Sequence, residues 1–331
     1  MDEILQDLIT TLRSSSRLLQ KRNIRNLWSI LPKVCEINGA KVMVGDDAAA
    51  IRYGDEYLLV AAEGVYPPLL KANPYLAGRT SVLTNVNDIY AMGGRPLAIV
   101  DVLFANNLSE AGEVLKGIRD NAFRYGVPVI GGHFTEGEGT SSLCVCIVGR
   151  ARKLVSSFNA KEGDDLVLIL NNKGRFYPSF NFWDSSSELG SKEVIEQLEL
   201  LPRIAEEGLA DAGKDISMGG IIGSLLMLLE SSGKGADIYL DRIPVPDEVT
   251  LKQWLLTFPS FGFVLSLRPQ NTLKVKAECE RIGLFCDQIG KVTLEQRVFF
   301  IDEKGNRELF WDIRHEPITG LGVQHVRSGN V

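Results

Sequence analysis

The chain has 331 residues, of which 45% are hydrophobic and 24% charged, and its formal net charge at pH 7 is -6. These values are ordinary for globular proteins, so they exclude a disordered or fibrous chain, and the length is sufficient for two domains. Because nucleic acids and anionic membranes are bound by basic surfaces, the acidic balance predicts a small-molecule partner, no nucleic acid and no membrane.

The N-terminal residues and the cysteines predict a cytoplasmic protein. Acidic residues stand in Met1–Thr10, where a secretory signal needs a basic stretch followed by an apolar one. The most apolar helical stretch, Ile221–Leu229, is far shorter than the roughly 20 residues that cross a bilayer. The five cysteines are an odd number without metal-site spacing, which fits reduced thiols in the cytoplasm.

The first half of the chain alternates predicted strands and helices. Apolar residues at near-helical intervals predict one or two helices over residues 3–30, which we expect to pack on the outside of the first domain. The pattern then predicts strands at 42–44, 48–51 and 57–62, a helix at 76–91, a strand at 97–104, a helix at 109–125, and strands at 127–130 and 142–149. We therefore expect an N-terminal helical segment, residues 1–40, and an α/β domain over residues 41–152.

The second half alternates strands and helices again, without repeating the sequence of the first. A polar turn before the apolar strand at 165–170 places the domain boundary at residues 150–161. Helices are predicted at 188–210, 220–231 and 269–282, and strands at 236–240 and 261–267. A second α/β domain then covers residues 160–295, and a C-terminal strand and tail cover residues 296–331.

Residues 171–187 lack periodicity and are rich in Asn, Ser and aromatic side chains. A loop of this length inside a compact domain is usually functional. Arg175 offers an anion-binding group, and the aromatic residues offer stacking surfaces. We predict that this segment is a lid that closes over the site, with Arg175 in contact with the substrate.

Carboxylates follow two predicted strands of the first domain. Asp46 and Asp47 stand in a tight turn after Gly45, and Glu63 follows the strand at 57–62. A turn that begins with glycine can direct both aspartates at one ion, and Mg²⁺ prefers one or two carboxylates together with phosphate oxygens and water. A solvated hairpin turn and an exposed acid at a strand end explain the same residues equally simply.

Polar residues also interrupt the helix predicted at 76–91. Asn85, Asn87 and Asp88 are poor residues for a helix interior, so their clustering indicates a polar task rather than packing. Asp88 therefore joins Asp46, Asp47 and Glu63 as a candidate ligand.

Two glycine pairs predict that the backbone approaches a ligand closely. The strand at 127–130 is expected to end in Gly131-Gly132, followed by His133, which is either a general acid or base or an ordinary hydrogen-bonding residue. The sequence Asp215-Ile216-Ser217-Met218-Gly219-Gly220 precedes an apolar helix, whose first N–H groups form a natural anion site. Ser217 is equally well explained as an ordinary N-cap.

Taken in order, four segments resemble the motifs of the aminoimidazole ribonucleotide (AIR) synthase-related superfamily, which includes AIR synthase, thiamine-monophosphate kinase and selenophosphate synthetase. The resemblance runs from Gly45 to about Val292, and the segments are Gly45-Asp46-Asp47-Ala48-Ala49, Asn87-Asp88-Ile89-Tyr90-Ala91-Met92-Gly93-Gly94-Arg95-Pro96, Gly131-Gly132-His133 and Asp215-Ile216-Ser217-Met218-Gly219-Gly220. It implies a two-domain α/β (α+β) fold, in which the first-domain sheets of two subunits pair into a barrel. It further implies a homodimer with ATP in the groove between subunits.

The resemblance also implies roles for individual residues. Those expected to bind ATP and Mg²⁺ as cofactors are Asp46, Asp47, Asn87, Asp88, Gly131, Gly132, Gly219 and Gly220. The expected metal ligands are Asp46, Asp47, Glu63, Asp88 and Asp215. His133 and Asp215 are the catalytic candidates, and Arg175 and Ser217 the substrate contacts.

The implied function is Mg-ATP-dependent phosphorylation of an amide-like or phosphate-ester oxygen on a small metabolite, with or without cyclisation or dehydration. His133 and Met218 stand where thiamine-monophosphate kinase has acids. Cys35 lacks the glycine-rich surroundings of the selenophosphate synthetase nucleophile, and the last four residues contain no cysteine of the kind that a hydrogenase maturation factor of the superfamily needs. Two alternatives stay open: a nucleotide-binding regulatory or partner subunit without turnover, and a thiamine-monophosphate kinase-like phosphotransferase.

Overall fold

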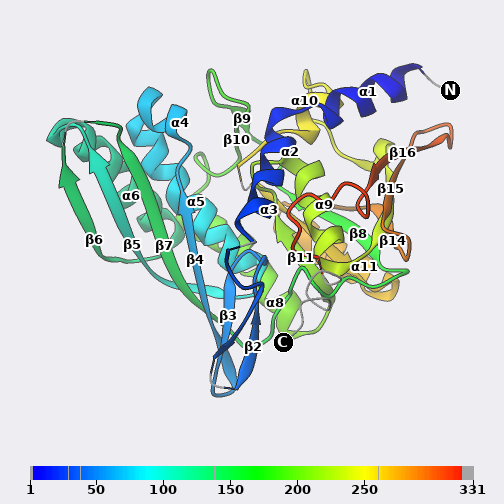
Figure 1. The fold of residues 1–331 in the computed structure, drawn as a ribbon, viewed down its shortest axis with the longest axis horizontal. Helices are drawn as coiled ribbons and strands as arrows, with labels where there is room; N and C mark the ends of the chain where they lie inside the picture. The colour runs from blue at the N-terminus through cyan, green and yellow to red at the C-terminus, as the bar shows by residue number, and fades with distance from the viewer. Residues whose placement is uncertain (1–2, 29, 38, 138, 260, 323–331) are drawn as a thin grey trace.

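The computed structural model describes residues 3–322, apart from Ser29, Asn38, Glu138 and Ser260. Figure 1 shows two sheet-and-helix units that lie side by side, with helix α5 (Pro74–Ala91) between them. The expected two-domain α/β fold is confirmed. No helix within the described ranges has the length and apolar character that a membrane span requires.

The first unit is a five-stranded sheet with helices on one face. Its strand order is β3-β4-β7-β5-β6, and all neighbours are antiparallel except β5 and β6. The strands are β3 (Ala49–Tyr53), β4 (Glu56–Gly64), β5 (Arg95–Ala105), β6 (Val129–Glu136) and β7 (Ser142–Ala151). The helices of this unit are α4 (Pro67–Ala72), α5 and α6 (Leu108–Tyr125). Burial alternates along β5, because only one face of the sheet is covered by helices.

Strand β6 corrects the strand predicted at 127–130, because it continues through the glycine pair instead of ending there. Gly132 and His133 lie opposite Asp101 and Val102 of β5 in a parallel ladder, which keeps the chain extended. A Cβ on Gly132 would lie 2.4 Å from Oδ1 of Asp101. Gly132 therefore leaves room for the Asp101 carboxyl group.

The second unit is a seven-stranded sheet with helices on both faces, in the order β11-β13-β8-β14-β12-β15-β16. Its strands are β8 (Asp165–Leu170), β11 (Ala210–Asp215), β12 (Gly235–Tyr239), β13 (Gly262–Leu267), β14 (Phe285–Thr293), β15 (Arg297–Ile301) and β16 (Arg307–Asp312). Its helices are α7 (Ser191–Leu198), α8 (Leu200–Glu206), α9 (Gly220–Ser232), the 3-10 turn η2 (Leu240–Arg242), α10 (Leu251–Leu255) and α11 (Pro269–Arg281). Alternate residues of β8 contribute to two hydrophobic cores, one on each face.

The helix predicted at 188–210 is wrong, because the chain forms two short helices and then strand β11. Helix α7 ends at Leu198, four residues before Pro202. A proline ring clashes with the carbonyl group four residues earlier, so Pro202 favours a break in the helix at this point. Strand β11 has few residues that favour strands on their own, and its pairing with β13 determines its conformation.

The N-terminal segment packs on the second unit, which corrects the expectation that it covers the first. It comprises α1 (Glu3–Arg13), α2 (Ser16–Gln20), the 3-10 turn η1 (Lys21–Asn23), α3 (Ile24–Leu27) and the hairpin of β1 (Val34–Ile37) and β2 (Ala40–Met43). Leu5, Ile9 and Leu12 are buried in the core of the second unit. Arg13 donates to the Phe310 carbonyl oxygen at 2.7 Å and pairs with Glu316 at 2.6 Å. These contacts direct α2 and η1 towards the space between the two units.

Residues 171–187, predicted as an unstructured lid, contain the short hairpin of β9 (Arg175–Phe176) and β10 (Trp183–Asp184). The Trp183 indole N–H donates to the Asn171 carbonyl oxygen at 3.1 Å, and the ring packs edge-on against Trp254. The Phe182 ring packs edge-on against Phe258. The second half of this segment is therefore docked on the second unit.

The close contact of α5 and α6 depends on two glycines. A Cβ on Gly117 would lie 2.1 Å from the Tyr75 carbonyl oxygen, and one on Gly78 would lie 2.1 Å from that of Val114. Gly117→Ala is therefore expected to lower the free energy of unfolding by about 1–3 kcal/mol through overpacking. Gly112→Ala, in open space on the same helix, is expected to raise it by up to about 1 kcal/mol. Urea denaturation of both variants measures the difference, and equal stabilities would contradict this account of the helix contact.

Candidate functional site

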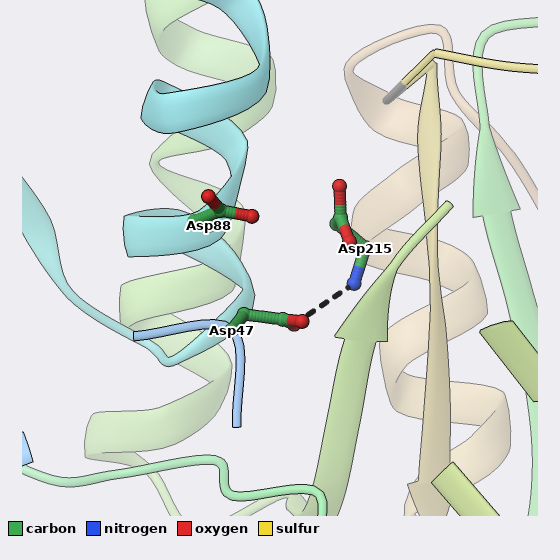
Figure 2. Close-up of side chains that lie close together, drawn as sticks. All are labelled: Asp47, Asp88 and Asp215. Atoms are coloured by element: carbon green, nitrogen blue, oxygen red, sulfur yellow. Dashed lines mark hydrogen bonds between the residues drawn. The ribbon is translucent and has the colours of Figure 1, made fainter. Parts of the chain in front are cut away.

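Three carboxylates from three separate elements converge between the two units. Asp47 stands in the turn after β2, Asp88 lies on α5, and Asp215 is the last residue of β11. Each offers an oxygen within 4.8 Å of those of the other two, and Figure 2 shows the side chains directed at one another. The Asp215 backbone N–H donates to Oδ2 of Asp47 at 3.1 Å.

A buried lysine compensates part of this negative charge. Lys214, which precedes Asp215 on β11, forms an ion pair with Oδ1 of Asp47, and both side chains are almost completely buried. Burial alone would lower the pKa of Lys214, but the carboxylates of Asp47, Asp215 and Asp46 raise it overall. Lys214 therefore remains charged at neutral pH and brings positive charge to the group of carboxylates.

The Asp88 carboxylate is buried among other carboxylates. Burial raises its pKa well above the ordinary value, and the charges of Asp215, Glu63 and Asp47 raise it further. Within the described part of the chain, Oδ2 of Asp88 is buried and has no hydrogen-bond partner. A hard divalent cation coordinated by oxygen would satisfy this atom and relieve the repulsion, so the donor set fits Mg²⁺.

The carboxylates line a cavity of about 400 Å³, a volume suited to a small ligand. One face of α5 contributes Thr80, Ser81, Thr84 and Asp88, and the N-terminal segment contributes Lys21. The aromatic and apolar walls include Trp28, Tyr66, Leu69, Phe182, Met218, Met227 and Phe258. The cavity wall therefore combines charged groups with aromatic and apolar ones.

Lys21 is the second lysine of this cavity. Burial lowers the pKa of its ammonium group, and the carboxylates of Glu63, Asp215 and Asp47 oppose that effect. Glu63 lines the same cavity at the end of β4, and burial raises its pKa while Lys21 lowers it. Lys21 and Glu63 thus add one basic and one acidic group to the cavity wall.

Asp46 lies on the cavity wall but outside the group of three carboxylates. Its Oδ2 accepts a hydrogen bond from the Ser156 hydroxyl, and its Oδ1 accepts one from the Ser157 N–H at 3.0 Å. Burial raises its pKa, and the charge of Asp47 adds to the effect. These bonds connect the turn to the segment that joins the two sheets.

The segment before α9 places Ser217 in the cavity wall, where its hydroxyl oxygen is buried without a partner among the described residues. Gly219 and Gly220 do not line the cavity. Gly220 has a φ of +69°, and a Cβ there would lie 2.4 Å from the Leu255 carbonyl oxygen. The structure therefore explains Gly220 by packing against α10.

Five other predicted residues also lie away from the cavity. Asn87 is buried on a neighbouring face of α5, and Arg175 is exposed on β9, where it pairs with Glu188 at 3.0 Å. Gly131, Gly132 and His133 lie on the exposed edge strand β6, and Nε2 of His133 is 3.1 Å from the Thr135 hydroxyl oxygen. A single chain does not bring these residues to the carboxylates.

Known families match both units of this fold. The model for AIR synthase related protein, N-terminal domain, matches residues 45–151, and that for the C-terminal domain matches residues 178–303. The protein sll0787 of Synechocystis sp. is 41% identical over 319 residues, which cover 96% of this chain and 99% of that protein. The chain belongs to the AIR synthase-related family.

Two further relatives indicate the range of this family. Selenide, water dikinase of Carboxydothermus hydrogenoformans is 31% identical over 248 residues, or 71% of this chain and 72% of that protein. The structure of T. maritima PurL complexed with ADP superposes with a TM-score of 0.75 at 20% identity, over 92% of this chain and 52% of that one. The first relative is named for phosphoryl transfer, and the second shares the fold.

The two lysines of the cavity, Lys21 and Lys214, were not predicted as site residues. A signal for Lys214 exists in the sequence, because a lysine that follows Ala212 and Gly213 is unusual in a buried strand. Lys214 was not predicted as a site residue because strand β11 was not predicted. For Lys21 the sequence offers no such signal, since a lysine in an amphipathic helix is ordinarily a surface residue.

The raised pKa of Asp88 makes the stability of the metal-free protein depend on pH. The folded-state pKa lies above the unfolded value of about 3.9, so the folded protein binds the extra proton between the two values. The contribution of Asp88 to the free energy of unfolding is therefore greatest below its unfolded pKa. This contribution is lost as the pH rises through the folded pKa. Asp88→Asn is expected to be more stable than the wild type at neutral pH without Mg²⁺, with a shallower pH dependence.

Urea denaturation in a chelating buffer, from about pH 5 to about pH 8, measures this effect. Asp211→Asn is the matched control, because Asp211 lies on the same strand as Asp215 but pairs at the surface with Lys161 and Arg268. Parallel pH profiles for Asp88→Asn and the wild type would show that Asp88 does not titrate as described.

Proposed function

We propose that this protein is a Mg-ATP-dependent enzyme that phosphorylates an oxygen, amide-like or of a phosphate ester, on a small metabolite. The observation that carries the proposal is the convergence of Asp47, Asp88 and Asp215 within 4.8 Å in the wall of one cavity. Packing does not call for three carboxylates in one buried place, since each raises the free energy of the others' ionised forms. A ligand that brings positive charge removes this cost.

The aspartates would hold Mg²⁺ together with the phosphate oxygens of ATP, with Glu63 and Asp46 beside them. When bound there, Mg²⁺ supplies positive charge that neutralises the phosphates. The three aspartates come from a turn, a helix and a strand, which fix their directions independently. Such preorganisation is most of what phosphoryl transfer requires of a protein.

The other polar groups of the cavity would position the phosphoryl group and the acceptor. Lys21 faces the same end of the cavity as Glu63 and can neutralise a transferred phosphoryl group. The unpartnered hydroxyl oxygen of Ser217 can contact the acceptor or a phosphate oxygen. Phe182 contributes to the cavity wall from segment 171–187, and the proposed role of Arg175 in substrate binding requires the exposed part of this segment to move towards the cavity.

The relatives support a nucleotide-dependent activity. Selenide, water dikinase covers most of this chain at 31% identity, and PurL has been solved in complex with ADP. The relatives do not identify the acceptor. Met218 lines the cavity, and it stands where the sequence motif of thiamine-monophosphate kinase has an acid, which weakens the match to that kinase. The regulatory alternative differs from the proposal in one measurable respect, the release of ADP.

The open face of the first sheet supports a homodimer. Val60, Val100, Val102 and Phe104 expose 36–44% of their surface on β4 and β5. In the strand register, Val102 is flanked by Cys144 on β7 and by His133 on β6. Apolar surface of this extent usually marks an interface, and pairing of two such faces would place His133 between the subunits.

The binding prediction concerns Asp88 and Mg-ATP. Asp88→Asn is expected to weaken Mg-ATP binding by at least about tenfold, because it removes a metal ligand without opening a cavity. Asp46→Asn is expected to weaken it as well, by loosening the turn that carries Asp47. Asp211→Asn is expected to leave it unchanged. Calorimetric titration of each variant with Mg-ATP is the measurement.

Turnover is tested by ADP release upon incubation with Mg-ATP and candidate amide or phosphate-ester metabolites. Acceptor-dependent release that Asp88→Asn abolishes supports the enzyme. Tight Mg-ATP binding without release for any acceptor would favour the regulatory alternative. Unchanged nucleotide affinity in Asp88→Asn would remove this residue from the metal site.

The dimer prediction concerns the open sheet face. Light scattering at micromolar concentration is expected to give twice the chain mass, and Val102→Glu is expected to give a monomer with intact secondary structure, because it places a charge in the buried interface. Leu273→Glu, at a position with 80% exposure on α11, is the control and is expected to remain dimeric. A monomeric wild type would contradict the dimer.

A further inference from the structure

The carboxylate of Glu230 lies near the end of α9 and holds a segment close to the C-terminus. Glu230 is 3% exposed. Its Oε2 accepts hydrogen bonds from the Ile318 N–H at 2.9 Å and the Thr319 N–H at 2.8 Å, and its Oε1 accepts one from the Gly320 N–H at 2.7 Å. The Thr319 hydroxyl adds a longer contact of 3.4 Å. A carboxylate that accepts several N–H groups fixes the backbone that provides them, because every donor would otherwise be buried and unpaired.

Residues 318–321, here called the C-terminal clasp, reach from Glu230 to the cavity. Ile318 and Leu321 are buried, and Thr319 and Leu321 line the cavity. Lys33, from the N-terminal segment, donates to the Gly320 carbonyl oxygen at 2.9 Å. The clasp therefore connects α9, the N-terminal segment and the cavity wall.

The clasp also packs against the turn that carries Asp47. Gly45 has a φ of +118°, and a Cβ at this position would lie 2.8 Å from Cδ1 of Leu321. The turn 45–48 belongs to no helix or strand, so its position depends on the groups that pack on it. On one side Asp46 is bound by Ser156 and Ser157, and on the other side Gly45 rests on Leu321.

The geometry points to Glu230 as a positioning residue for the metal-binding turn. Its carboxylate holds the clasp, the clasp places Leu321 against Gly45, and this contact acts together with Lys214 and the Asp215 N–H to keep Asp47 within reach of Asp88 and Asp215. The inference rests on the proposed function for the identity of the ligand, Mg²⁺. Glu230 itself acts through the backbone of residues 318–320 and not by contact with the ligand.

A purely structural role for Glu230 predicts a different effect on the affinity for Mg²⁺. If the clasp only fastens the chain end, its release changes stability and local exchange but leaves the affinity for Mg²⁺ unchanged. If the clasp positions Asp47, the affinity falls while the fold persists. The affinity for Mg²⁺, measured well below the unfolding temperature, therefore separates the two roles.

The experiment compares Glu230→Gln and Leu321→Ala with the wild type in the full chain. Glu230→Gln replaces an acceptor by an amide donor that faces backbone N–H groups, and Leu321→Ala removes the contact with Gly45 without touching a carboxylate. Glu303→Gln, an exposed position in the turn between β15 and β16, is the matched control. Calorimetric titration with MgCl₂ gives the affinity, and hydrogen exchange of residues 318–321 reports the state of the clasp.

We expect Glu230→Gln to exchange its clasp amides at least tenfold faster and to bind Mg²⁺ at least tenfold more weakly. Leu321→Ala is expected to bind Mg²⁺ more weakly with the amide bonds to Glu230 retained, and Glu303→Gln to match the wild type. Unchanged Mg²⁺ affinity in Leu321→Ala would overturn the positioning role even if Glu230→Gln failed to fold. A wild type that binds no Mg²⁺ would instead overturn the proposed metal site itself, and this result is distinct from the first.

Discussion

The repulsion among Asp47, Asp88 and Asp215 is the constraint on which the rest of this structure depends. Three carboxylates within 4.8 Å, in a region largely removed from water, are unstable together unless positive charge is supplied. The protein supplies only part of it, through Lys214 and Lys21, and leaves the pKa of Asp88 strongly raised. The protein by itself thus compensates the charge of the site only in part, which is the physical argument for the cation proposed above.

Bringing the three carboxylates together requires both sheet units at once. Asp88 belongs to the first unit, on a helix that packs on its sheet, while Asp215 ends a strand of the second. Asp47 stands between them and is held by Lys214 and the Asp215 N–H from one side. The cavity wall also includes Lys21 near the beginning of the chain and Leu321 near its end. The shape of the cavity therefore depends on how segments far apart in the sequence pack together.

The elements with strong local signals were predicted well. Helix α5 and strand β8 match the predicted ranges closely, because α5 is a long helix and β8 a continuous apolar run bounded by turns. The predictions failed where the local signal was weak or ambiguous. Strand β11 lacks β-branched residues, and β6 continues through glycines that ordinarily break strands. In both cases pairing with a neighbouring strand overrides the local preference.

The sequence by itself supplied the aspartates as candidates: Asp88 is a poor residue for a helix interior, and the acids in the turn and at the strand end were assigned through the resemblance of their motifs to the family. Tertiary structure alone decided which of them meet. It placed Asp47, Asp88 and Asp215 together, bound Asp46 to Ser156 and Ser157, and added the two lysines. The reason is physical: a residue's chemistry is local, whereas convergence depends on helix and strand directions that are set by contacts far apart in the chain. For Lys21 those contacts are the burial of α1 against the second unit, which no pattern within residues 3–30 specifies.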